Sequence, residues 1–149
     1  MYKKDEGFTL VELIVAIALI GVIGTMVFTL VGAGRNQTRI ARENFDAQSE
    51  ARIAMAYITT TIRQNDINGG VSVLGSALVI RNSSGALYQV ISFNNANKNL
   101  WVRDVVLNST KVIANINGVT FRQDGNRIDI TIGYGNDKEL KSTITLRSE

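Results

Sequence analysis

An uninterrupted apolar stretch near the N-terminus limits what this chain can fold into more than any other feature. The 21 consecutive residues 13–33 carry no charge. As an α-helix with a rise of about 1.5 Å per residue, the stretch is roughly 32 Å long, which matches the hydrocarbon core of a bilayer. Its apolar residues occur all round the helix, whereas the surface helix of a water-soluble domain has a polar face. The stretch therefore predicts one membrane-spanning helix.

A single carboxylate, Glu12, stands at the N-terminal edge of this stretch. A charged carboxylate at the centre of a bilayer costs on the order of 3 kcal/mol on insertion scales, so such a group usually has a partner. Two interpretations follow. Glu12 lies at the headgroup level in contact with water, or it pairs with a positive group of another chain. The spacing alone favours the first interpretation.

The residues that surround Glu12 resemble the class III signal of the type IV pilin superfamily. A short charged leader, residues 1–6, is followed by Gly7, Phe8, three further residues, Glu12 and then about twenty apolar residues. This order is typical of that superfamily, which includes pilins, minor pilins, secretion-system pseudopilins and competence pilins. A secretory signal would instead have its apolar segment before the cleavage site and lose it on processing.

This resemblance implies how the chain would be processed and assembled. A prepilin peptidase would cleave after Gly7, and Phe8 would become the N-terminal residue and be N-methylated. Glu12 would then meet the positive N-terminus of a neighbouring subunit. An amine and a carboxylate offset part of each other's desolvation, and a missing partner is penalised, so the pair would select the register of a helix bundle. The leader would face the cytoplasm and the C-terminal domain would lie outside.

Composition excludes several kinds of site. The 149 residues contain no cysteine and no histidine, so a disulfide, a cysteine nucleophile, a Ser-His triad and a typical zinc site are excluded. The chain therefore departs from the many pilins that have a C-terminal disulfide loop, and it also lacks the proline that often kinks the pilin anchor. The net charge of +3 is too small to indicate a nucleic-acid partner. We expect no enzyme, no cofactor and no metal.

Residue patterns divide the chain into four segments. They are a leader (1–7), a transmembrane and assembly helix (8–34), an amphipathic helical half (35–67) and an antiparallel β domain (68–149). The helix is expected to continue through Gly32-Ala33-Gly34 and to stop at residues 65–70, Asn-Asp-Ile-Asn-Gly-Gly. Spacings of three and four residues place one stripe on the amphipathic half, made of Ile40, Asn44, Ala47, Ala51, Ala54, Ile58 and Ile62. The fold class expected is α+β, a pilin-like long helix packed on an antiparallel sheet.

Strand-like runs alternate with Asn, Gly and Ser turns after residue 70. The expected strands are 78–81, 87–93, 100–107, 111–116, 119–123, 127–133 and 141–147. Alternation is clearest in the last three, and the apolar residues of the last two are expected to pack onto the helical stripe: Ile128, Ile130, Ile132, Ile144 and Leu146. Residues 116–121 and 127–147 also resemble the ends of PilW-type minor pilins and J-type pseudopilins.

Two clusters of side chains suggest ligands besides the N-terminal motif. Asp124, Asp129, Asp137 and Glu139 supply oxygen ligands of the kind that calcium takes, although Asx turns explain the same residues and are favoured. Trp101, with Arg103, Tyr88 and Phe93, suggests an adhesive or DNA-stacking patch. For Trp101 a half-buried core position is the favoured interpretation.

The function expected from these observations is structural. The chain would be a minor pilin or pseudopilin of a type IV pilus or a type II secretion-like filament. It would be held in the cytoplasmic membrane and then polymerised through its N-terminal helix into a surface pilus or a periplasm-spanning pseudopilus. Its partners would be the prepilin peptidase, other pilin subunits, and the assembly platform with its ATPase. The alternative is a competence pilin or tip adhesin whose globular domain binds DNA or a surface.

Overall fold

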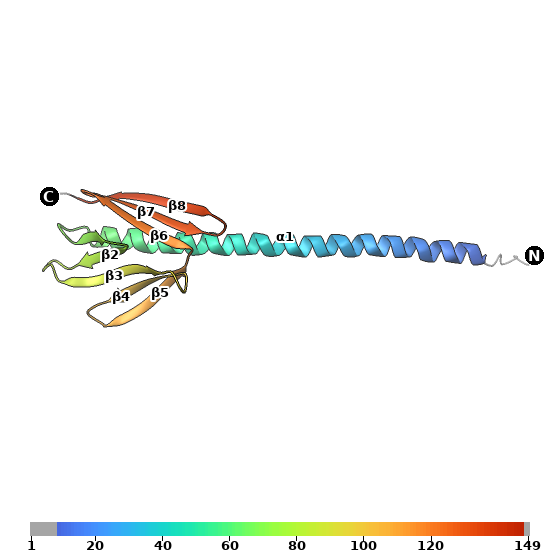
Figure 1. Cartoon of the computed structure of the whole chain (residues 1–149), viewed down its shortest axis with the longest axis horizontal. Helices are drawn as coiled ribbons and strands as arrows, with labels where there is room; N and C mark the ends of the chain where they lie inside the picture. Colours follow the sequence, from blue (N-terminus) through green and yellow to red (C-terminus); the bar gives the residue numbers. More distant parts are fainter. Residues whose placement is uncertain (1–8, 148–149) are drawn as a thin grey trace, which may run out of the picture. The chain divides into compact units, whose positions relative to one another are not determined.

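The computed structural model describes residues 9–147, apart from the side chains of residues 34–37. One helix, α1 (Leu10–Gln64), is followed by eight strands (Figure 1). The chain forms two compact units, Met1–Arg42 and Glu43–Glu149. The first part of α1 belongs to one unit, and its last part belongs to the other together with all the strands.

Helix α1 continues without interruption through Gly21, Gly24 and Gly32. Glycine in a helix interior costs up to about 1 kcal/mol relative to alanine, but the chain has no proline that would remove a backbone hydrogen bond. The helix ends at Gln64, where the Asn65 side chain donates a hydrogen bond to the carbonyl oxygen of Thr61 (2.8 Å). This bond satisfies one of the carbonyl groups that a helix end leaves without a partner.

The strands form two antiparallel sheets. They are β1 (Val71–Leu74), β2 (Ala77–Arg81), β3 (Leu87–Asn94), β4 (Asn99–Asp104), β5 (Ser109–Asn115), β6 (Gly118–Asp124), β7 (Arg127–Tyr134) and β8 (Lys138–Thr145). Strands β1 to β5 form one sheet in sequence order, and β6 to β8 form the other. Figure 1 shows both sheets gathered around the C-terminal part of α1. The predicted α+β class, with one long helix before an antiparallel β domain, is confirmed.

The structure differs most from the predicted strands at two places, and β8 also begins and ends earlier than the predicted 141–147. Strand β1 was not expected, because its four residues follow directly on a run of glycine and asparagine. Residues 105–107 were assigned to a strand because they are aliphatic, but β4 ends at Asp104. The Asp104 carboxylate accepts the backbone N–H of Leu107 (2.9 Å), and Asn108 adopts a positive φ of 47°. This side-chain-capped turn overrides the β propensity of the aliphatic residues.

The core of the second unit lies between α1 and both sheets. Four members of the predicted stripe, Ala51, Ala54, Ile58 and Ile62, are fully buried, whereas Ile40 is exposed. The isoleucines of β7 and β8 complete the same hydrophobic cluster, as their alternation predicts: Ile128, Ile130, Ile132 and Ile144. Each buried aliphatic side chain of this size contributes roughly 1.5–3 kcal/mol relative to an exposed one.

Candidate functional site

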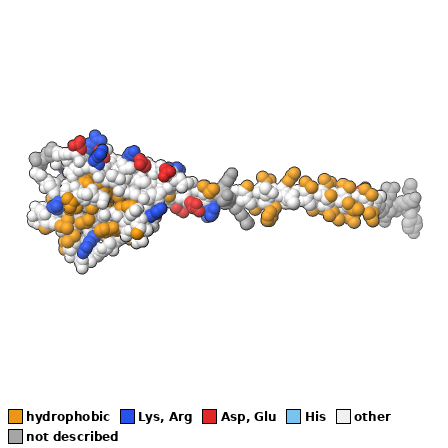
Figure 2. Space-filling view, viewed as in Figure 1, with side chains coloured by type: hydrophobic (Ala, Val, Ile, Leu, Met, Phe, Trp, Pro, Cys, Tyr) orange, Lys and Arg blue, Asp and Glu red, His pale blue; other side chains and the backbone are white. Residues whose placement is uncertain are grey.

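The N-terminal part of α1 exposes an apolar surface all round. Its large hydrophobic side chains between Leu10 and Val31 are each at least half exposed, and they give the row of hydrophobic side chains seen along this segment in Figure 2. Within the described residues, α1 is the one helix long and apolar enough to cross a membrane by length and composition. Such a surface is stable in lipid or against other helices, and not in water.

Two threonines inside the apolar segment have their hydroxyl groups satisfied by the helix itself. The Thr25 hydroxyl donates to the carbonyl oxygen of Val22 (2.8 Å), and the Thr29 hydroxyl donates to that of Thr25 (2.8 Å). An unpaired hydroxyl in hydrocarbon would carry a desolvation penalty. The segment therefore contains polar residues without presenting free donors to lipid at these two positions.

Glu12 belongs to a reciprocal hydrogen-bonded cap at the start of α1. Its Oε2 atom accepts the backbone N–H of Thr9 (3.0 Å) and the Thr9 hydroxyl (3.0 Å). The Thr9 Oγ1 atom in turn accepts the backbone N–H of Glu12 (3.3 Å). This arrangement is a capping box, in which a threonine and a glutamate three residues later satisfy each other's backbone N–H groups. Sequence reasoning missed it, although the Thr-x-x-Glu spacing before an apolar run is its usual signature.

The cap fixes where the Glu12 carboxylate lies. Both bonds go to one carboxylate oxygen, Oε2, so the side chain is folded back over the first turn of the helix. Its charge also lies in the first turn, where the helix dipole favours a negative group. Glu12 is thus held at the N-terminal end of the apolar segment. The predicted cleavage and methylation residues, Gly7 and Phe8, lie outside the described residues.

The candidate calcium ligands do not come together. Asp124 closes β6 and Asp137 lies in the turn between β7 and β8, so the eight residues of β7 separate them. Asp129 lies within β7, where it accepts bonds from the Arg127 guanidinium (3.0 and 3.1 Å) and the Thr143 hydroxyl (2.6 Å). Among the described residues, no group of three or more carboxylates is placed to hold a metal.

The aromatic residues of the candidate patch separate into two environments. Tyr88 and Phe93 pack against the buried core. Trp101 is half-buried, as expected, but it is not part of that core. It lines a shallow hollow of about 390 Å³ with Arg103, Val112 and three polar residues. The four-residue stacking patch therefore does not form as one surface.

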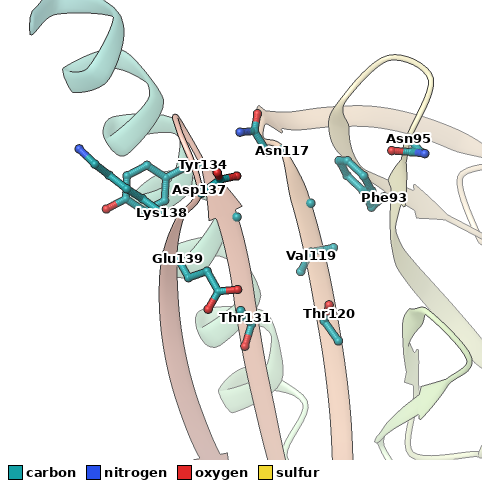
Figure 3. Close-up of a pocket in the computed structure, with 12 residues that line it drawn as sticks. Phe93, Asn95, Asn117, Val119, Thr120, Thr131, Tyr134, Asp137, Lys138 and Glu139 are labelled. Atoms are coloured by element: carbon teal, nitrogen blue, oxygen red, sulfur yellow. The ribbon is translucent and has the colours of Figure 1, made fainter.

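A second hollow of about 520 Å³, lined by both polar and apolar residues, lies on the second unit, Glu43–Glu149, which we call the sheet unit (Figure 3). Gly118 and Gly133 are paired directly across β6 and β7 and contribute bare backbone to it. The side chains around the glycines bear amide, hydroxyl, carboxylate and ammonium groups, including Asn117, Thr120 and Glu139. Hydrogen bonding to a polar group is the chemistry that this lining offers.

Comparison with known protein families gives one match, at the N-terminus. Residues 2–31 match the family model described as the prokaryotic N-terminal methylation motif. No curated protein and no solved structure matched the chain. The matched segment includes Gly7, Phe8 and the Thr9–Glu12 cap, and it extends through most of the apolar segment. It is a motif of structural, pilin-type proteins rather than of an enzyme family. The chain therefore carries the class III signal of a type IV prepilin-like protein, the kind of signal that prepilin peptidase processes.

Proposed function

We propose that this protein is a structural subunit, a minor pilin or pseudopilin, of a type IV pilus or a type II secretion-like filament. Prepilin peptidase cleaves it between Gly7 and Phe8, and Phe8 is then N-methylated. The subunit waits in the cytoplasmic membrane and is polymerised through α1 by an assembly platform and its ATPase. The finished filament reaches the cell surface as a pilus or crosses the periplasm as a pseudopilus.

The observation that carries this proposal is the conjunction of the methylation motif with a capped helical segment whose large apolar side chains are each at least half exposed. A membrane anchor needs an apolar surface, but it has no need of a carboxylate at Glu12. In a filament, that carboxylate pairs with the amine of a neighbour's Phe8. The cap leaves Oε2 bonded within its own chain, and a carboxylate has about four lone-pair sites, so a further donor can be accepted.

Two substitutions at Glu12 separate its role as a helix cap from its proposed role as the partner of a neighbour's Phe8 amine. Glu12→Gln keeps an oxygen that can accept the Thr9 N–H, because glutamine replaces glutamate in capping boxes, but it removes the charge. Glu12→Ala removes both the cap and the charge. We expect both variants to insert in the membrane and to be cleaved, and we expect both to fall at least about tenfold in filament incorporation, since an unpaired buried amine costs several kcal/mol.

Incorporation is measured by comparing each variant in sheared filaments with the same variant in the membrane fraction. Thr9→Val is the matched control, because it removes the hydroxyl of the cap and retains the Glu12 charge. We expect Thr9→Val to assemble far better than Glu12→Gln. If Glu12→Gln assembles normally while Glu12→Ala and Thr9→Val fail, Glu12 acts only as a helix cap and the pairing with Phe8 is wrong.

A further inference from the structure

An apolar turn projects from one end of the sheet unit. It connects β4 to β5 and consists of Val105, Val106 and Leu107, of which Val106 is 70% exposed and Leu107 is 74% exposed. Turns usually contain glycine, asparagine, aspartate or proline, and here Val106 and Leu107 leave most of their side-chain area in solvent. We call these three residues the apolar turn.

The apolar turn is held in a defined conformation by hydrogen bonds at both of its ends. The Leu107 N–H is bound by the Asp104 carboxylate (2.9 Å), and the Val105 N–H donates to the carbonyl oxygen of Tyr88 on β3 (2.9 Å). Asn108 closes the turn with a positive φ. The backbone is thus anchored on two strands while the side chains of Val106 and Leu107 point into solvent.

The apolar turn lies at the end of the sheet unit where α1 also terminates. Arg147 donates its backbone N–H to the Asp66 carboxylate just beyond α1 (3.0 Å), and Arg81 at the end of β2 donates its backbone N–H to Gly70 (2.7 Å). The antiparallel register of the large sheet brings the ends of β2 and β4 to this end, and that of the small sheet brings the start of β7 to the end of β8, near Arg147. We call it the distal end.

Several arginines belong to the elements that end or begin at the distal end. Six of them lie at or near the ends of α1 and the strands there: Arg63, Arg81, Arg103, Arg122, Arg127 and Arg147. Lys111, the third residue of β5, also lies near this end, whereas Lys98 and Lys138 lie at the opposite end, before β4 and at the start of β8. No periodicity in the sequence reveals this separation, since the arginines are dispersed along the chain and only the alternating strand directions bring them together.

The arginines outnumber the carboxylates at the same end among the described residues. Four aspartates lie there, Asp66, Asp104, Asp124 and Asp129. Three of them already accept hydrogen bonds from the protein, and of the arginines only Arg127 is paired with one of them in an ion pair. The distal end therefore combines a projecting apolar turn with an excess of cationic side chains. Figure 2 shows hydrophobic and basic side chains side by side on the sheet unit.

We infer that the distal end docks on an anionic lipid surface, with the apolar turn inserted among the acyl chains and the arginines at the phosphate headgroups. Aliphatic side chains gain from burial in hydrocarbon, and each basic residue near an anionic bilayer adds attraction. A bilayer accepts a projecting turn without a matching pocket. A stable protein interface instead needs roughly 20–30 residues a side, and nucleic acid favours stacking aromatic residues over aliphatic ones.

The absence of cysteine allows one probe to be placed beside the apolar turn. Ser109→Cys, the exposed first residue of β5, is labelled with an environment-sensitive fluorophore in the full chain, which is anchored through α1 in phosphatidylcholine nanodiscs and mixed with separate vesicles. The vesicles contain either phosphatidylcholine alone or phosphatidylcholine with phosphatidylglycerol as about one third of the lipid. With the anionic lipid we expect a blue shift of emission and quenching by spin-labelled acyl chains. The same label at Ala96→Cys, in the turn at the opposite end of β4, stays in water.

Two further variants carry the Ser109→Cys label and test the apolar turn and the arginines separately. Val106→Ser with Leu107→Ser removes the apolar turn and is expected to abolish the quenching. Arg103→Gln with Arg147→Gln is expected to reduce the blue shift and to make it disappear at lower salt than in the parent chain. Overall folding of each variant is checked by circular dichroism.

Three results would overturn the inference. The first is water-like emission from the Ser109→Cys label in both kinds of vesicle. The second is a blue shift without quenching that rises with protein concentration in phosphatidylcholine alone, which assigns the apolar turn to contacts between copies of the chain. The third is a shift that duplex DNA produces without anionic lipid, which assigns the arginines to nucleic acid.

Discussion

At the scale of single residues, hydrogen bonds among the side chains of Arg127, Asp129 and Thr143 connect two strands of the small sheet. Asp129 lies on β7 with its carboxylate between the Arg127 guanidinium and the Thr143 hydroxyl of β8. The hydrogen bond from Arg127, followed by that from Thr143, lowers the pKa of Asp129 below its usual value. The contact therefore joins the two strands and favours the ionised form of Asp129.

Because the pKa of Asp129 is lowered in the folded state, the stability that this contact contributes depends on pH. Stability from Asp129 is fully present above the pKa of an unfolded aspartate, about 3.9, and is lost as the pH falls through the lower pKa of the folded protein. The effect is small, because the ion pair is exposed to solvent. We expect Asp129→Asn to be less stable than the parent near neutral pH and to match it in strong acid.

Unfolding in urea, followed by the fluorescence of the single tryptophan Trp101, measures this difference in detergent-solubilised full chain. The difference between the two proteins should shrink as the pH is lowered below about 4. A difference that stays constant over that range would show that the carboxylate charge contributes nothing at this position.

At the scale of secondary-structure elements, the passage from α1 into β1 depends on one glycine. A Cβ atom added at Gly70 would lie 2.5 Å from the carbonyl oxygen of Asn65 and 2.5 Å from the side chain of Ile67. The backbone oxygen cannot move without disturbing the turn that ends the helix, in which Gly70 also donates its N–H to Ile67.

Gly70→Ala should therefore destabilise the sheet unit by about 1–3 kcal/mol, the usual range for forced overpacking. Gly118→Ala is the matched control, because Gly118 has no positive φ and a Cβ atom there meets nothing within 4 Å. Thermal unfolding by circular dichroism compares the two. Equal melting temperatures for both variants would contradict the close packing at the end of α1.

The sequence predicts correctly those elements in which apolar residues recur at the regular spacing of a helix or of a strand. The stripe of Ala51, Ala54, Ile58 and Ile62 and the alternating isoleucines of β7 are buried as expected, because a single buried face dictates their spacing. Where local chemistry competes with propensity, prediction fails. Val105, Val106 and Leu107 read as a strand, yet the Asp104 carboxylate turns the chain there.

In the candidate sites too, features formed by neighbouring residues can be predicted from the sequence, whereas features formed by residues far apart in the chain cannot. The Thr9–Glu12 cap is readable from four residues, because both partners lie in one helical turn. The distal arginines are not readable, since strand order and direction decide which of them meet. The expected stacking patch fails for a related reason: the β3 aromatic residues pack against the core, whereas Trp101 on β4 does not.

At the scale of the whole molecule, one chain combines a sheet unit with its own core and a helical segment that has none. The first unit buries none of its apolar segment, so it depends on lipid or neighbouring helices for stability. The second unit contains the whole hydrophobic cluster of the described residues. Such a division suits a subunit that changes its surroundings from membrane to filament while its folded domain stays unchanged.

As a prepilin-like subunit, the protein would lose its charged leader and retain its apolar helix. Intact-mass and N-terminal peptide spectrometry of the protein isolated from cells, with and without an active prepilin peptidase, tests it most directly. We expect a mature chain that begins at Phe8 with one added methyl group, and an uncleaved chain when the peptidase is inactive. A mature protein that still begins at Met1, or that begins after residue 33, would contradict it.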